Sequence, residues 1–257
     1  MKKNFTKLLF ITLMALVCGT ATAQTDSVKV RGMGKNLLKV SLTSLALNTY
    51  NFSYERKIGR KISVGIGYRV MPEGSLPFKS NLESVIDDPE TFKHIDGLKT
   101  GNTAITPEIK FYFGKGVFRG FYISPFARFA TYTAELNTFE YEYEHPVTNQ
   151  TVTATIPLKG ELKTTTGGLL FGAQWKLSKL IYLDWSILGP QYGTSKGFLK
   201  GEKALTNDER DALQEELEDL EIPMVDSEVK VDNTGARVDF TGPWAGVRAS
   251  IGLAFRF

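Results

Sequence analysis

The chain has 257 residues, with 31 Lys plus Arg against 28 Asp plus Glu and a formal net charge of +3. Three of the basic residues lie in an N-terminal segment that we expect to be removed, so 28 basic residues then balance 28 acidic ones. This balance excludes nucleic-acid binding driven by overall charge. The single cysteine, Cys18, lies in the same segment, so the mature chain is expected to form no internal disulfide.

Residues 1–23 have the pattern of a secretory signal peptide. Three lysines precede a ten-residue apolar run at 8–17, and an A-x-A cleavage site ends at Ala23. The apolar run is too short for a membrane-spanning helix, which needs about 20 residues. We therefore expect residues 24–35 to form a periplasmic N-terminal segment and residues 36–257 to form the exported domain.

The exported part contains eight segments in which apolar and polar residues alternate, as they do in β-strands with one apolar face. The clearest segment begins at Ile62, and the last one runs from Val247 to Phe257. The first segment alternates from Leu38 through Leu42 to Ala46, and the other five begin near Tyr50, Ile105, Phe121, Leu169 and Ile181. Strands of about ten residues in an even number are typical of a barrel that leaves no unpaired edge in lipid.

The connections between these segments alternate in length. Those after the second, fourth and sixth strands are residues 59–61, 114–120 and 178–179, whereas those after the third, fifth and seventh are 72–103, 134–163 and 190–243. Short turns on one rim and long loops on the other are expected of outer-membrane barrels. The sequence thus predicts an all-β fold, an eight-stranded antiparallel transmembrane β-barrel with long outer loops and one short loop helix.

The polar faces of the predicted strands carry many charges, which we expect to form a lumen charge network. An eight-stranded barrel has an interior that side chains just fill, and buried charges are tolerated when they are paired. We therefore predict a salt-bridged plug, with a narrow anion-selective channel as the alternative. The predicted lumen residues are Lys39, Glu55, Arg69, Glu108, Lys110, Arg128, Lys176, Asp184, Arg248 and Arg256.

Two of the long loops have patterns of their own. In the second, the aromatic residues Phe139, Tyr141 and Tyr143 alternate with glutamates, which predicts a hairpin that continues the barrel wall and packs on the other loops or docks a partner or sugar. In the third, Thr206 and Glu209 form a capping box, which predicts an amphipathic helix over the barrel mouth. Leu213, Leu217 and Leu220 fall on one face of this helix, and its eight acidic residues predict a solvated face or, as the alternative, cation bridging to lipid.

Catalysis and a soluble fold are the remaining alternatives. The only histidines, His94 and His145, lie on long loops, and no nucleophile elbow, metal-ligand pair or phosphate-binding loop accompanies them, so we expect neither an enzyme nor a cofactor. A soluble periplasmic β-barrel binding protein would turn the apolar faces inward. Aromatic residues near the strand ends favour a lipid-facing surface instead, and they include Tyr50, Tyr68, Trp175, Trp185, Trp244 and Phe257.

The segment "GVRASIGLAFRF" resembles the C-terminal sorting signal that the barrel insertion machinery of Gram-negative bacteria recognises, with Ile251, Leu253, Phe255 and Phe257 as its apolar residues. With "GFYISPFARF" and the acidic third loop, the chain is similar to small eight-stranded outer-membrane barrels of Bacteroidetes-type bacteria, mostly of unknown function. The resemblance implies a monomer in the outer membrane, surrounded by lipid, with a structural or surface-interaction role. A surface partner would contact the outer loops.

Overall fold

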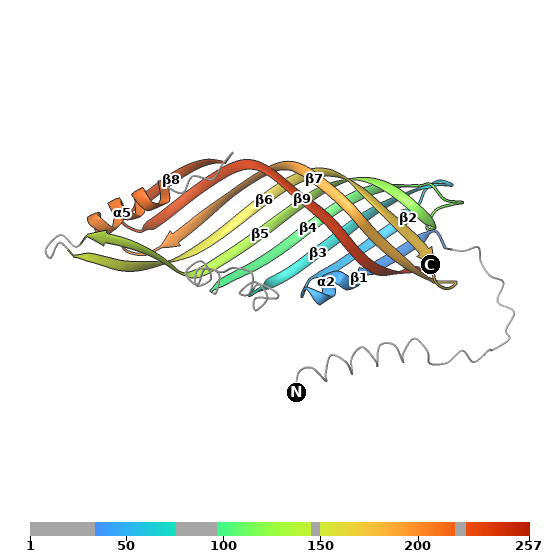
Figure 1. Cartoon of the computed structure of the whole chain (residues 1–257), viewed down its shortest axis with the longest axis horizontal. Helices are drawn as coiled ribbons and strands as arrows, with labels where there is room; N and C mark the ends of the chain where they lie inside the picture. Colours follow the sequence, from blue (N-terminus) through green and yellow to red (C-terminus); the bar gives the residue numbers. More distant parts are fainter. Residues whose placement is uncertain (1–33, 76–96, 145–149, 219–224) are drawn as a thin grey trace, which may run out of the picture. The chain divides into compact units, whose positions relative to one another are not determined.

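The computed structural model describes residues 34–75, 97–144, 150–218 and 225–257, and this part of the chain is mostly antiparallel β-sheet (Figure 1). The strands are β1 (Asn36–Ser41), β2 (Tyr50–Lys57), β3 (Ile62–Ser75), β4 (Leu98–Tyr112), β5 (Gly120–Glu144), β6 (Thr151–Lys176), β7 (Ile181–Glu202), β8 (Asp226–Asp232) and β9 (Gly235–Arg256). The helices are α2 (Leu42–Ala46) and α5 (Asn207–Glu218). Neither of these described helices is long and apolar enough to cross a membrane.

Eight strands form a closed ring in the order β1-β2-β3-β4-β5-β6-β7-β9, with β9 paired back onto β1. The closing ladder places Leu37 opposite Arg256 and Ser41 opposite Gly252. Near its start, β9 pairs with the additional strand β8, in the register of Asp232 opposite Gly235. The predicted all-β, eight-stranded antiparallel barrel of the outer-membrane type is therefore confirmed, while β8 lies in a region that the sequence predicted as loop.

The side chains of the ring have the polarity of a membrane barrel. Phe121 is 61% exposed on the outer face, whereas Lys110 is 2% exposed inside the ring. A water-soluble barrel would bury apolar residues and expose charged ones. The soluble periplasmic barrel is thus contradicted. The exposed outer face includes Phe52, Ile66, Tyr68, Ile105, Phe129, Phe171, Trp185 and Leu253.

Strand length divides the barrel into a ring and a tall extension of one side. β5 has 25 residues and β6 has 26, although about 9–11 residues are enough to cross a membrane. The β5–β6 ladder continues to Glu144 opposite Thr151, with a register shift between Leu136 and Phe139. The hairpin predicted within the connection 134–163 is therefore confirmed, and Figure 1 shows these strands running on beyond the shorter strands β1 to β3.

The extended parts of β5, β6, β7 and β9, together with α5 and β8, form what we term the outer extension, and it has a hydrophobic core of its own. The core residues are Tyr141, Ile156, Leu158, Leu205, Leu213, Leu217 and Ala236. Helix α5 packs on β5 and β8. Its capping box is confirmed, because the Thr206 backbone N–H donates to Glu209 Oε2 at 2.9 Å and the Glu209 N–H donates to Thr206 Oγ1 at 3.4 Å. Leu220 lies outside the described residues.

Two local predictions are wrong. The stretch Leu42–Ala46 was predicted to continue the first strand but forms helix α2, because the Ser41 hydroxyl accepts a hydrogen bond from the Ser44 N–H and so caps a helical turn. Trp244 was predicted to face lipid, yet its ring lies 5.4 Å from that of Tyr132. Since two strands separate β5 from β9 in the ring, this contact crosses the interior.

Candidate functional site

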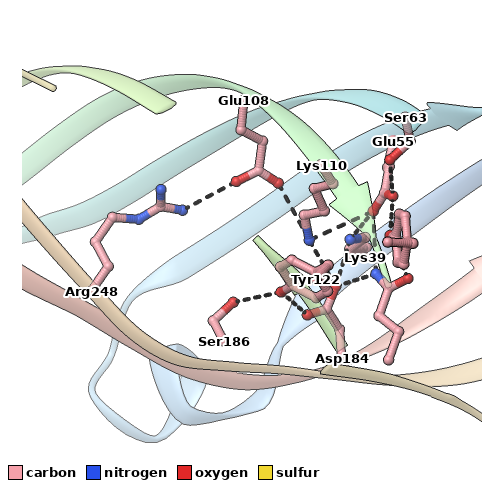
Figure 2. Close-up of polar contacts among 11 residues, drawn as sticks. Lys39, Glu55, Ser63, Glu108, Lys110, Tyr122, Asp184, Ser186 and Arg248 are labelled. Carbon is pink, nitrogen blue, oxygen red and sulfur yellow. Dashed lines mark hydrogen bonds and ion pairs between the residues drawn. The ribbon is translucent and has the colours of Figure 1, made fainter. Parts of the chain in front are cut away.

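The centre of the lumen is filled by two lysines and two carboxylates from four strands, which we term the lumen network (Figure 2). It consists of Lys39 from β1, Glu55 from β2, Lys110 from β4 and Asp184 from β7. Asp184 Oδ2 lies 2.5 Å from Lys39 Nζ and 3.3 Å from Lys110 Nζ. Glu55 pairs with Lys39 and lies 3.7 Å from Lys110 Nζ. These side chains are nearly inaccessible to solvent, so each charge has lost its hydration. The ion pairs with the neighbouring side chains must compensate for that loss.

Neutral side chains satisfy the remaining hydrogen-bonding capacity of the network. Tyr112 donates its hydroxyl to Glu55 at 2.5 Å, and Tyr122 donates to Asp184 Oδ1 at 2.8 Å. Gln174 donates through Nε2 to Asp184 Oδ2 at 2.5 Å and to Glu55 at 3.2 Å. The ion pairs, the amide and the two tyrosine hydroxyls thereby join β1, β2, β4, β5, β6 and β7 in one buried polar cluster, which fixes these strands relative to one another.

An aromatic floor closes the end of the ring that carries the short turns. Phe118, from the turn between β4 and β5, is fully buried even though its φ of +69° is uncommon for a residue other than glycine. Its ring contacts Tyr112 and Tyr182 edge-on, with centroids 6.4 Å apart in both cases. Arg256 donates to the Tyr182 hydroxyl at 2.7 Å and stacks over Phe118. Tyr112 belongs to both the floor and the hydrogen bonds of the lumen network, so the two are continuous.

On the side of the network away from the floor lies a small cavity, which we term the arginine cavity. Its volume is about 50 Å³, and its charged wall includes Arg69, Arg128 and Arg248. Glu108 is shared, with its carboxylate 3.5 Å from Lys110 Nζ and 3.8 Å from Arg248 Nη2. Figure 2 shows Arg248 reaching toward Glu108 from the opposite side to Lys110.

The structure brings together eight of the ten predicted lumen residues. They form the lumen network or the wall of the arginine cavity, whereas Arg256 belongs to the floor. Lys176 is exposed at the end of β6 and lies outside the network. The four apolar residues of the predicted sorting signal are all exposed on the outer face of β9 and its end, namely Ile251, Leu253, Phe255 and Phe257.

Sequence reasoning missed several residues of the site. Tyr112 and Tyr122 stand on the same alternating face as Lys110 and Arg128, so their periodicity could have assigned them to the lumen. Phe118 lies in a glycine-rich turn, where no periodicity indicates that its ring folds back into the barrel. His94 and His145 lie outside the described residues.

The outer extension contains a second polar site, the extension latch, formed by Tyr141, Lys203 and Glu209. Lys203 Nζ donates to Glu209 at 3.0 Å and to the Tyr141 hydroxyl at 2.9 Å. Burial acts to raise the pKa of Glu209, but the hydrogen bond from the Thr206 backbone and the lysine outweigh it, so this pKa lies below its ordinary value. Burial acts to lower the pKa of Lys203, and the hydrogen bonds to Tyr141 and Glu209 reverse that, so this pKa is raised.

Most of the acidic residues of α5 are solvent-exposed, but Glu209 is buried in the latch rather than on the predicted solvated face. Within the described ranges, no group of three or more His, Cys, Asp or Glu side chains is placed to hold a metal ion. The aromatic stripe of the hairpin packs inside the extension, because Tyr141 is buried and Phe139 and Tyr143 are packed against the same core. The predicted packing of these aromatic residues within the outer loops is thus what the structure shows.

A closed antiparallel ring with apolar residues outside and a charged interior defines an outer-membrane type of β-barrel. The model of a family described as "Protein of unknown function (DUF3575)" matches residues 9–200, and the chain belongs to this family. No curated protein matches the chain. Among solved structures, the chain is similar to the outer membrane protease OmpT from Escherichia coli, with 10% identity and a TM-score of 0.39. That match covers 88% of this chain and 93% of the other.

Proposed function

We propose that the protein is a sealed outer-membrane barrel whose function lies in the envelope structure or in surface interactions made by its outer extension. The observation that carries this proposal is the filling of the lumen by its own side chains. The lumen network and the aromatic floor follow one another along the barrel axis, and both are anchored on several strands. Transport through the ring would require these buried ion pairs to separate.

The distribution of ordered structure supports the same proposal. The extension has a core, a capped helix and a polar latch, so it is built as a folded unit rather than as a set of independent loops. Loops and extensions carried by a rigid barrel are the usual place for specific function. In the proposed orientation, the short turns face the periplasm and the extension stands on the cell surface, as in other small outer-membrane barrels of Gram-negative bacteria.

Cell fractionation followed by electrophoresis of unboiled and boiled samples tests the proposed location. We expect recovery in the outer membrane and a band whose mobility changes on boiling. Removal of Phe257 is expected to lower this recovery, since that residue belongs to the proposed sorting signal for the barrel insertion machinery. A protein recovered in the periplasm with no mobility change would refute the proposed location.

Planar-bilayer recordings test whether the barrel is sealed. The wild-type protein should show no regular conductance steps, while Lys110→Ala, Asp184→Ala and Phe118→Ala combined should produce them, because a central ion pair of the network and the buried ring of the floor are both removed. Ser227→Ala, on the extension strand β8, is the matched control and should stay silent. Regular anion-selective steps from the wild type would instead establish the narrow channel.

The surface role is tested by complementation of a deletion strain that has lost resistance to detergent. Leu213→Asp places a charge in the extension core, where Leu213 is fully buried, so it should unseat α5 while leaving the ring folded. We expect the wild-type gene to restore resistance and this variant to fail. Full complementation by Leu213→Asp, with α5 shown to be displaced, would restrict the function to the ring.

A further inference from the structure

We propose that the arginine cavity binds a small oxyanion, with inorganic phosphate or a terminal phosphate group as the ligand chemistry. Arg69, Arg128 and Arg248 come from three different strands, β3, β5 and β9, and line the same cavity. They lie close enough to repel one another electrostatically. This inference goes beyond the surface role proposed above and does not depend on it.

The first argument is the balance of charge around the cavity and the network below it. Five basic groups stand against three acidic ones, which leaves an excess of two positive charges; the basic groups are Lys39, Arg69, Lys110, Arg128 and Arg248, and the acidic ones are Glu55, Glu108 and Asp184. Glu55 and Asp184 already serve the two lysines, and Glu108 is shared between Lys110 and Arg248. A partly buried excess of this kind calls for a counter-ion.

The second argument is the supply of hydrogen-bond donors. In the part of the chain that the structure describes, the buried Arg69 Nε and Arg248 Nη1 have no hydrogen-bond partner. Arg128 is only 6% exposed, and its Nη1 makes a long hydrogen bond of 3.3 Å to the Thr106 hydroxyl. Guanidinium groups present planar, forked donors that match the oxygens of phosphate. A wall with more donors than acceptors selects an anion over a cation or a neutral sugar.

The third argument is size and access. A cavity of about 50 Å³ holds roughly the volume of four water molecules at ~10–15 Å³ each, which suits one small tetrahedral oxyanion. The lumen network closes the cavity on the side of the short turns. A ligand would therefore enter from the rim of the long loops, past the Tyr132–Trp244 ring pair that crosses the interior on that side, and stop at the network.

Calorimetric titration of the full-length protein with sodium phosphate, in detergent and against a sodium chloride control, tests the site. We expect saturable binding by the wild type and at least tenfold weaker binding by Arg69→Gln combined with Arg248→Gln. Arg60→Gln, which changes an exposed arginine of the β2–β3 turn, is the matched control and should bind as the wild type does. No saturable phosphate binding by the wild type, or equal binding by the double variant, would overturn the proposal.

Thermal unfolding separates binding from a merely structural role. Without phosphate, the double variant should unfold at the same temperature as the wild type or higher, because two mutually repelling charges are gone. Phosphate should raise the unfolding temperature of the wild type and not that of the double variant. If the double variant does not give a heat-modifiable band, Arg128→Lys replaces it, since it keeps the charge but loses the forked donors, and a drop in phosphate affinity is again required.

Native mass spectrometry of protein purified without added phosphate distinguishes the sources of the ligand. A small-ion adduct that is lost from the double variant identifies free phosphate, and an adduct with the mass of a phospholipid identifies a lipid headgroup. Either adduct supports oxyanion recognition by the three arginines. An adduct retained in full by the double variant contradicts it.

Discussion

The lumen network allows a sharp prediction for Asp184→Asn, a change that preserves side-chain volume and removes one charge. Asp184 Oδ2 accepts hydrogen bonds from Lys39, Lys110 and Gln174, and Oδ1 accepts one from Tyr122. In asparagine one of these oxygens becomes an NH₂ group, so at least one of these accepted hydrogen bonds is lost. Lys39 would then have only Glu55 as an ion-pair partner, and Lys110 would have Glu55 and Glu108.

The magnitude follows from the burial of the pair. Removal of one partner from a buried ion pair costs about 3–5 kcal/mol, because the other charge stays buried without compensation. Lys39, Lys110 and Asp184 are all at least nine-tenths buried, so solvent does not screen the interaction between their charges. We expect Asp184→Asn to lower the free energy of unfolding by about 3–5 kcal/mol.

The assay is reversible urea unfolding in lipid vesicles, followed by tryptophan fluorescence, with the heat-modifiable band as the check on folding. Asp239→Asn is the control, since Asp239 pairs with Arg237 at 2.6 Å on the exposed extension and such pairs contribute about 0–1 kcal/mol. A cycle with Lys39→Met should show a coupling of at least about 1 kcal/mol with Asp184→Asn. If Asp184→Asn costs no more than Asp239→Asn at an unchanged slope with urea, the network does not hold the ring together and the reasoning fails.

Three further predictions concern the extension and the floor. Leu213→Ala should destabilise the extension by about 2–5 kcal/mol through lost core packing, seen as faster amide exchange in α5 with an unchanged heat-modifiable band; slow exchange would contradict it. Because the pKa of Glu209 is lowered, this carboxylate should stabilise the extension above pH ~4.3, and the stabilisation should be lost as the pH falls through its folded-state pKa. Because the pKa of Lys203 is raised, this ammonium should stabilise the extension below pH ~10.4, and the stabilisation should be lost as the pH rises through its folded-state pKa. Amide exchange measures both effects, and an acid dependence that persists in Glu209→Gln would argue against the latch. Phe118→Ala should cost about 3–5 kcal/mol, because a fully buried ring is removed from the floor, and urea unfolding with Phe113→Ala on the exposed outer face as control measures it; equal effects of the two changes would refute the role of the floor.

The two faces of the barrel wall could be predicted from the sequence, because successive side chains of a strand point to opposite faces. One face requires apolar residues and the other accepts polar ones. Glu55, Lys110 and Asp184 were assigned to the interior for that reason alone. Their pairing could not be predicted, since it depends on the stagger of strands β2, β4 and β7, which are not neighbours in the ring. Lys176 shares the same periodicity but lies at the end of its strand, where the ring gives way to solvent.

In the extension, residues with a low intrinsic preference for strands form strands because they pair with neighbouring strands. Residues 190–202 and 226–241 contain Gly, Lys and Asp, which are depleted in strands, and they were predicted as loop. They form strand because β7, β9 and β8 satisfy one another's backbone groups side by side. Trp244 was a different error, since the alternation of the last strand already places it on the same face as Arg248.

The ladder that closes the ring has a kinetic consequence. It joins β1 to β9 through five residue pairs, from Leu37 opposite Arg256 to Ser41 opposite Gly252, and the Asn36 and Phe257 backbones that complete it are 221 residues apart. Contacts between such distant residues form late, because the chain entropy lost on closing so long a loop is recovered only when the intervening hairpins are in place. Until the β1–β9 ladder forms, both strands have an unpaired edge. The unclosed barrel is therefore the folding state most prone to pair with a neighbouring chain.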